Sequence, residues 1–217
     1  MAKIKSFQFW SQADVEKTFM LKQIPKAKEL EDLLAATQDL NTTELASLDT
    51  LRQKLLEMAF GWSEEDLKVL FIGPVLNFAD MAHREYRLFL DYTIKAEINN
   101  ETIGGKVDCL LAKGFFAPES PFFFLQEFKR ERGRDTDPAG QLLAAMVVSQ
   151  CLNGSEDILY GCYVTGRSWF FLVLKDKEYA VSNAFNVTEK DLYQVVAILR
   201  KIKMMFEQKI NYVAQQV

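Results

Sequence analysis

Two neighbouring stretches of this chain carry an aspartate, a glutamate and a lysine that together could hold a divalent metal and activate a water molecule. Asp108 lies in an apolar stretch that follows Gly105, and the apolar run 122–125 is separated from Glu127 only by Gln126. Residues two apart on a strand point to the same face, so Glu127 and Lys129 point together. Charges near a core are costly unless they are paired or bind metal. The pattern therefore favours a catalytic use of these three residues.

The chemistry that fits this set is phosphodiester hydrolysis. That reaction needs a hard cation held by oxygen ligands, and Asp108 and Glu127 could supply carboxylates for Mg²⁺ or Mn²⁺. Lys129 could orient the attacking water or stabilise charge in the transition state. The alternative is a surface ion pair, worth at most about 1 kcal/mol. The run 122–125 is apolar on both faces, which indicates a covered strand and argues against exposure.

The segments Val107-Asp108 and Glu127-Phe128-Lys129 resemble the motif of the PD-(D/E)XK nuclease superfamily. The resemblance covers about residues 63–165. It implies a divalent-metal-dependent nuclease with a restriction-endonuclease-like core. We expect DNA rather than RNA as its substrate, although the sequence does not decide between them. The resemblance also implies that Asp108 and Glu127 bind the metal and that Lys129 is the catalytic lysine. Val107 departs from the family pattern, which has proline before the aspartate.

Two helices add further candidates through the same resemblance. Glu64 lies on the apolar face of its helix, so we expect it, rather than Glu65, to be a third metal ligand; the helix dipole alone also favours an acid there. Gln141 looks like the glutamine with which the RecB-like branch holds its site geometry, although it could simply bond a loop carbonyl. Glu64 followed by Lys68 resembles the nuclease module of type I restriction subunits.

The pattern of apolar residues predicts the elements that position these side chains. The expected helices cover about 11–21, 26–37, 41–61, 63 onward, 139–152 and 189–206. The expected strands cover about 86–98, 103–112, 122–129, 158–165, 169–175 and 178–182. Gly73-Pro74 should interrupt or kink its helix, and Asp137-Pro138 should start the next. The segment 169–174 is either an inner strand or a buried oligomer edge.

This order predicts an α/β (α+β) fold with a mixed central sheet flanked by helices and one helical crossover. We expect a helical extension at residues 1–61 and a nuclease-like domain at 62–217. The net charge is −4, so any contact with nucleic acid must be local. The basic residues Arg130, Arg132 and Arg134 adjoin the proposed site and could meet phosphates, or could form a solvated loop.

A second hypothesis belongs to another class of protein. The chain could be a non-catalytic binding or assembly module with a nuclease fold, in a restriction, repair or mobile-element system. The acidic net charge favours this alternative, and the helices before residue 62 could then dock a protein partner. The sequence also leaves a homodimer open.

The cysteines and the N-terminus indicate a compartment. Cys109, Cys151 and Cys162 lie in apolar segments without metal-ligand spacing, so we expect three small core residues in a reducing environment. The sequence shows no apolar signal-peptide stretch and no run long enough to span a membrane. We therefore expect a cytoplasmic protein that does not engage a membrane.

Overall fold

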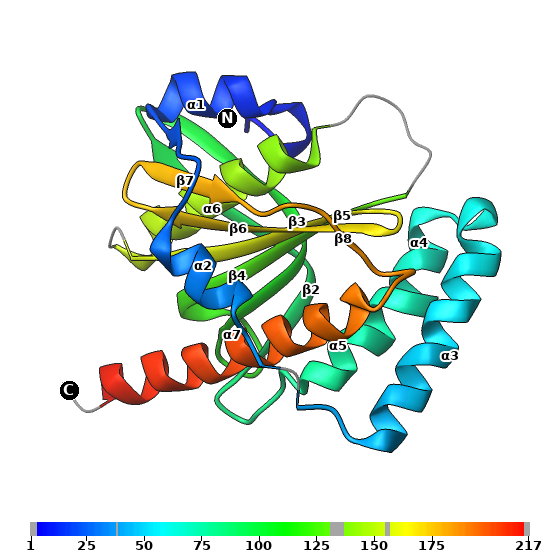
Figure 1. Cartoon of the computed structure of the whole chain (residues 1–217). Helices are drawn as coiled ribbons and strands as arrows, with labels where there is room; N and C mark the ends of the chain where they lie inside the picture. The colour runs from blue at the N-terminus through cyan, green and yellow to red at the C-terminus, as the bar shows by residue number, and fades with distance from the viewer. Residues whose placement is uncertain (1–3, 38, 131–136, 155–156, 215–217) are drawn as a thin grey trace.

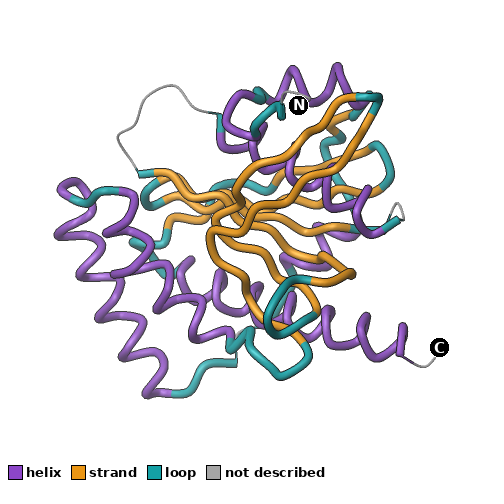
Figure 2. Tube along the Cα trace, turned by 180° about the vertical axis from the view of Figure 1, so that it is seen from behind, coloured by secondary structure: helices purple, strands orange, loops and turns teal. Residues whose placement is uncertain are grey.

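A mixed sheet lies at the centre of the molecule, with helices covering both of its faces (Figures 1 and 2). The structure is a computed structural model, and it describes residues 4–37, 39–130, 137–154 and 157–214. The sheet has eight strands in the order β1-β7-β6-β5-β4-β3-β2, with β8 paired to β6. This architecture confirms the predicted α/β class with a mixed sheet.

Most of the sheet is antiparallel, and only β4–β5 and β1–β7 run parallel. Its strands are β1 (Lys22–Gln23), β2 (Tyr86–Ile98), β3 (Glu101–Lys113), β4 (Glu119–Lys129), β5 (Leu159–Thr165), β6 (Ser168–Lys175), β7 (Glu178–Val181) and β8 (Phe185–Asn186). The parallel pair β4–β5 requires a crossover, which α6 supplies, as predicted. The short strands β1 and β8 were not predicted. β6 is an inner strand, so the inner-strand reading of 169–174 is confirmed.

The helices divide between the two faces of the sheet (Figure 1). They are α1 (Gln12–Phe19), α2 (Lys28–Leu34), α3 (Thr42–Met58), α4 (Glu64–Leu67), α5 (Gly73–Ala79), α6 (Pro138–Asn153) and α7 (Asp191–Ala214). On one face, α6 packs against β4 and is covered by α1 and the 3₁₀ turn Phe7–Phe9. On the other face, α7 contacts β4 and carries α2, α3 and α5. Each face has its own hydrophobic cluster.

Side-chain caps set where several helices begin. In each of three capping boxes, a polar side chain accepts from the backbone N–H three residues on, and the acid there bonds back to the cap. The pairs are Ser11 with Asp14, Asn41 with Glu44, and Ser63 with Asp66. Asp137 caps α6 and Pro138 follows at its first position, as the sequence predicts. The last of the three boxes fixes the start of α4, which carries Glu64.

The helix after Ser63 continues past Gly73-Pro74 by changing its winding. Between α4 and α5 the backbone forms a π-helical turn, Lys68–Ile72, in which the Gly73 N–H bonds the Lys68 carbonyl. Proline has no N–H to give to the preceding turn, and its ring crowds the carbonyl four residues back. A π turn relieves that conflict without breaking the helix, and such turns often mark functional sites.

The segment before residue 62 is built into both cores. Trp10, Val15 and Phe19 belong to the cluster under α6, whereas Leu48 and Leu55 belong to the cluster around α7. The division at residue 61 stays a prediction, but both sides of it share the same hydrophobic clusters. No helix in the described ranges is long and apolar enough to cross a bilayer.

One expectation about the cysteines is wrong. Cys109 and Cys162 are buried, but Cys151 is exposed. Cys151 lies in the last turn of α6, and burial in that helix extends only from Ala139 to Gln150. The apolar run of the sequence therefore continues past the point where the helix leaves the core.

Candidate metal and catalytic site

The site forms where β3 and β4 stop pairing. Their last matched residues in this direction are Cys109 and Gln126, so Asp108 and Glu127 are the next positions on each strand. The Asp108 carboxylate accepts a hydrogen bond from the Phe128 backbone N–H at 2.7 Å. An Asp108 side-chain oxygen thus accepts the hydrogen bond that a backbone carbonyl would accept if the two strands stayed paired. We call the point where β3 and β4 separate the β3–β4 fork. The arrangement brings the two carboxylates predicted from the sequence to one place.

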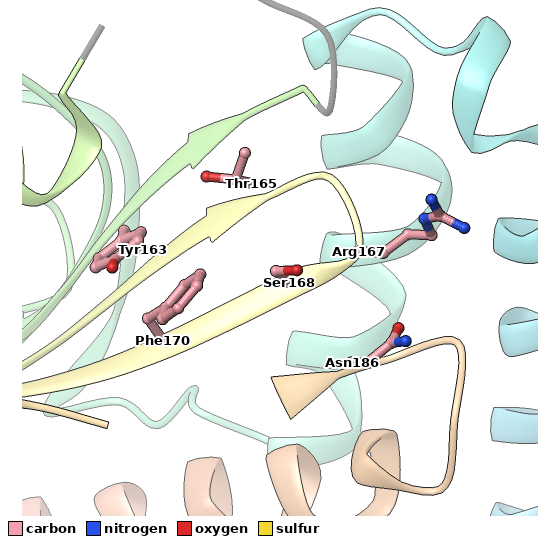
Figure 3. A pocket seen from close by; sticks show the side chains of 6 residues that line it. All are labelled: Tyr163, Thr165, Arg167, Ser168, Phe170 and Asn186. Carbon is pink, nitrogen blue, oxygen red and sulfur yellow. The ribbon is translucent and has the colours of Figure 1, made fainter. Parts of the chain in front are cut away.

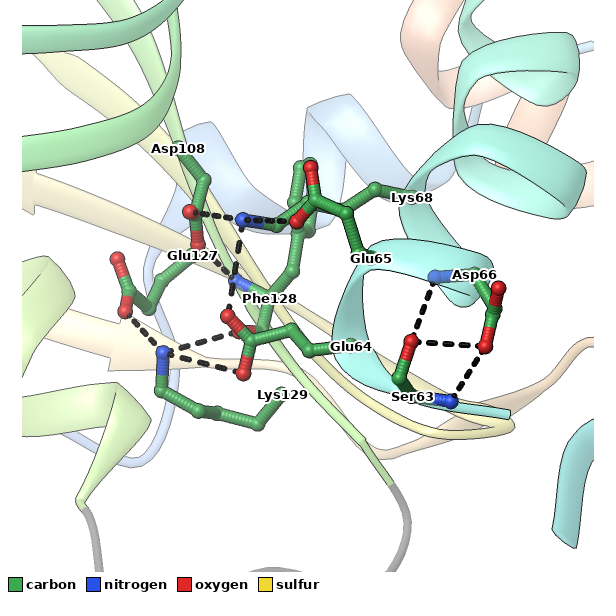
Figure 4. Close-up of polar contacts among 9 residues, drawn as sticks. All are labelled: Ser63, Glu64, Glu65, Asp66, Lys68, Asp108, Glu127, Phe128 and Lys129. Atoms are coloured by element: carbon green, nitrogen blue, oxygen red, sulfur yellow. Dashed lines mark hydrogen bonds and ion pairs between the residues drawn. The ribbon is translucent and has the colours of Figure 1, made fainter. Parts of the chain in front are cut away.

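Glu127 and Lys129 lie together on β4, as the two-residue spacing predicts (Figure 4). The Lys129 ammonium donates to Glu127 Oε1 at 2.6 Å and to the Phe128 carbonyl at 3.0 Å. Both side chains are largely covered, with 11% of Glu127 and 22% of Lys129 exposed. An ion pair this sheltered differs from the solvated surface pair that was the alternative.

Helix α4 closes the site from the other side through Glu64 and Lys68 (Figure 4). Lys68 donates to Asp108 Oδ1 at 2.8 Å, and Glu64 lies 3.6 Å from Lys68 and 3.9 Å from Lys129. Among the described residues, Glu65 forms an ion pair only with Lys68, at 3.9 Å, and its side chain is 72% exposed. The geometry therefore favours Glu64 over Glu65 as the helix carboxylate.

Lys68 is the site residue that the sequence reasoning did not assign to the site. It follows Glu64 by one helical turn, at the start of the π-helical turn after α4, so the two side chains share a face of this continuous helix. That spacing was the signal that could have identified it. Its partner Asp108 is forty positions away, and only the packing of α4 beside the fork brings the two together.

Three carboxylates therefore face two ammonium groups: Glu64, Asp108 and Glu127 against Lys68 and Lys129. The pKa of Glu127 is raised to about 7, first by burial and then by the charge of Asp108, against the opposing effect of Lys129. A raised carboxylate pKa means that its negative charge is not fully compensated by its surroundings. A bound cation would compensate it.

The pKa values of the two lysines are raised as well, which for an ammonium group favours the charged form. Burial lowers the pKa of Lys68, but the hydrogen bond and charge of Asp108 outweigh burial and raise it above its ordinary value. For Lys129 burial is likewise outweighed, here by the charge and hydrogen bond of Glu127, so its pKa is also raised. Both lysines therefore carry their full charge at neutral pH.

The donor chemistry of the site suits a hard divalent cation, since its acceptors are carboxylate oxygens. Within the described ranges, however, no three His, Cys, Asp or Glu side chains are grouped closely enough to hold a metal ion as they stand. The ammonium groups of Lys68 and Lys129 lie between the carboxylates (Figure 4). The lysines thus neutralise acids that would otherwise repel one another.

The remaining candidates lie in different places. Gln141 is buried in the first turn of α6, and its backbone N–H donates to the Asp137 carbonyl. No hydrogen bond recorded among the described residues joins its side chain to the acid cluster. Arg130 is exposed and helps to line a cavity of about 360 Å³ at the start of α4. Arg132 and Arg134 lie outside the described residues.

Comparison with known proteins adds no family assignment. No protein-family model matches the chain, and no curated protein matches it. A solved structure titled "Crystal structure of SSO0001" is 12% identical, with 88% of this chain and 82% of that chain covered and a TM-score of 0.28. A similarity of that size carries no argument about fold or function.

Proposed function

We propose that this protein is a Mg²⁺- or Mn²⁺-dependent nuclease of the PD-(D/E)XK type, with DNA rather than RNA as its substrate. The observation that carries the proposal is the fork between β3 and β4. There Asp108 and Glu127 are brought together, with the Lys129 ammonium 2.6 Å from Glu127. This is the set of groups that metal-assisted phosphodiester hydrolysis requires.

Each residue has a distinct role in the proposed reaction. Asp108, Glu127 and Glu64 would hold the cation, which when bound would supply Lewis-acid activation of the phosphate and of water. Lys129 orients the attacking water and stabilises the negative charge that develops on the phosphate. Lys68 holds the Asp108 carboxylate in position through its 2.8 Å hydrogen bond. Gln141, at the start of α6, supports the geometry.

A non-catalytic assembly module is the second candidate function. Its support is the net charge of −4, together with a carboxylate set that is closed by its own lysines. In that reading, the ion-pair network fixes α4 against the sheet and requires no metal. The two functions differ in whether divalent cations bind at this site.

The test is cleavage of end-labelled single-stranded DNA, duplex DNA and RNA in Mg²⁺ or Mn²⁺, comparing the native chain with two variants. Lys129→Met removes the catalytic ammonium while keeping most of the side-chain length. Asp108→Asn keeps an acceptor for the Phe128 N–H, so the hydrogen bond that joins β3 to β4 at this point is retained. We expect each variant to lose at least about a hundredfold in rate, the scale of losing one electrostatic stabiliser.

The matched control is Lys113→Met, at the far end of the strand that carries Asp108. Lys113 is exposed, so this variant should cut DNA like the native chain. Full activity in Lys129→Met would overturn the catalytic assignment. Absence of cutting by the native chain, together with no heat of Mn²⁺ binding in calorimetry, would favour the assembly module.

A further inference from the structure

A cavity of about 540 Å³ opens beside the proposed catalytic residues, over the ends of β5 and β6 (Figure 3). It is lined by Tyr163, Thr165, Arg167, Ser168, Phe170 and Asn186, and we call it the Tyr163–Phe170 cavity. The strand register places it next to the acid site. Lys129 pairs with Thr165, and Thr165 pairs with Ser168 on the following strand.

The aromatic residues of the cavity continue the row that begins at Glu127. Glu127 pairs with Tyr163 across β4–β5, and Tyr163 pairs with Phe170 across β5–β6. Residues paired across a sheet share a face, and neighbouring strands lie about 5 Å apart. Glu127, Tyr163 and Phe170 therefore stand side by side on one face of the sheet, within roughly 10 Å.

The two rings form a stacked pair that is only half-buried. Their centroids are 4.6 Å apart and their planes differ by 13°. Both rings border open space in the cavity rather than being enclosed by the core. A half-covered aromatic stack is a surface on which a further planar ring can stack, and nucleobases bind proteins in this way.

The other lining groups suit a polyanion with hydrogen-bonding edges. Thr165 and Ser168 present hydroxyl groups. The Asn186 Oδ1 already accepts from the Thr188 N–H and hydroxyl, so this amide offers its NH₂ group as a donor. Arg167 brings a positive charge to the rim, where its guanidinium also lies over the Phe60 ring at 4.9 Å. Among the described residues lining the cavity none is acidic, in contrast to the neighbouring carboxylate site.

We propose that the Tyr163–Phe170 cavity binds one nucleobase of a single-stranded nucleic acid, adjacent to the phosphodiester that reaches Lys129. The role of the neighbouring site rests on the proposed nuclease function, whereas base binding in the cavity can be measured without it. A base can lie against these rings only after it has left its own stack in a duplex. The cavity therefore selects single strands and unpaired ends over continuous duplex.

The test separates binding from cutting by working in EDTA. Fluorescence anisotropy of a labelled oligo-dT strand is measured for the full native chain, Phe170→Leu and Phe170→Tyr. Phe116→Leu is the matched control, because Phe116 is an exposed phenylalanine in the loop at the other end of the β3–β4 hairpin. Near-ultraviolet circular dichroism and thermal melting confirm that each variant is folded.

We expect Phe170→Leu to bind the single strand roughly tenfold more weakly, the loss typical of one base–aromatic stack. Phe170→Tyr should restore binding, Phe116→Leu should behave as native, and blunt duplex should bind native and Phe170→Leu equally. Equal affinity of folded Phe170→Leu and native chain for the single strand would overturn the cavity assignment.

The cavity and the nuclease proposal fail in different ways. A native chain that cuts DNA in Mg²⁺, with binding unchanged in Phe170→Leu, would overturn the cavity alone. A native chain that binds single strands through Phe170 but never cuts them would sustain the cavity and overturn the nuclease function. A native chain that binds no single strand would overturn the cavity.

Discussion

At the scale of single residues, Glu127 experiences two opposing influences. Burial and the charge of Asp108 favour its neutral form, whereas the Lys129 ammonium 2.6 Å away favours its charged form. Burial dominates, so the Glu127 pKa rises from 4.5 to about 7. The carboxyl proposed as a metal ligand therefore changes charge close to neutral pH, and under the proposed function a cation and a proton would compete for it.

This competition predicts how the stability of the metal-free protein depends on pH. Because the folded pKa of Glu127 lies above its unfolded value, the native state binds the proton more tightly and gains stability as pH falls from about 7 toward 4.5. The effect is at most on the order of 3 kcal/mol. Glu127→Gln cannot titrate, so the difference in melting temperature, native minus variant, should increase between about pH 8 and about pH 5 in EDTA.

Added Mg²⁺ gives the complementary result. A cation binds the ionised carboxylate, so it should raise the melting temperature of the native chain more at about pH 8 than at about pH 5. Glu127→Gln should respond less to the metal at either pH. A native-minus-variant difference that stays constant with pH would show that Glu127 titrates at its ordinary value.

How far the sequence predicts the site depends on the range of each interaction. The spacing of Glu127 and Lys129 is local, because strand geometry alone places them on one face. The pairing of Asp108 with Glu127 required a correct alignment of two strands, and the order of hydrophobic segments was enough to suggest it. Lys68 was not assigned to the site, because its contact with Asp108 depends on how the helix after Ser63 packs beside the sheet. The spacing from Glu64 indicates a shared helix face, but it does not predict that contact.

At the scale of elements, the start of α6 joins two distant parts of the chain. Asp137 accepts from the Gly140 N–H at 2.9 Å, as a cap, and from the Gln12 N–H at 2.6 Å, at the start of α1. A Cβ on Gly140 would lie 2.4 Å from the Gln12 nitrogen. Only glycine allows the two helix starts to approach so closely.

Asp137→Ala should therefore lower stability by more than the loss of an ordinary cap. Removing a cap costs about 1 kcal/mol, and leaving the Gln12 N–H unpaired adds a similar amount, so we expect about 2–3 kcal/mol in urea denaturation. Asn41→Ala is the matched control, since Asn41 caps α3 through the Glu44 N–H alone. Equal losses in the two variants would show that the bond to Gln12 contributes nothing.

Element prediction succeeded where the signal was strong and local. The predicted strand 86–98 matches β2 at both ends, and Asp137-Pro138 marks the start of α6 correctly. The short strands β1 and β8 were missed, because two residues carry too little periodicity to identify. They exist because tertiary packing brings β1 beside the outer edge of β7, and β8 beside the part of β6 that β7 does not cover.

At the scale of the whole molecule, the segment before residue 62 completes both hydrophobic clusters. Expressing residues 62–217 alone would expose the surfaces that Trp10, Phe19 and Leu48 now cover. We expect this fragment to bind a hydrophobic dye and to lack a cooperative urea transition, whereas the full chain unfolds in one step. A sharp transition in the fragment would establish residues 62–217 as an independent domain.

The parallel pairing of β1 with β7 also affects the order in which the protein can fold during synthesis. Lys22 and Gln23 are made before the other sheet strands, and their partners Glu178 and Tyr179 follow more than 150 residues later. Helix α7, which covers the face of the sheet opposite to α6, is made after β7. Until then the strands already made lack part of the sheet and one covering helix. The last step of folding therefore depends on contacts between residues far apart in sequence, which form slowly. We therefore expect a nascent chain of this protein to be prone to aggregation until β7 and α7 have been made.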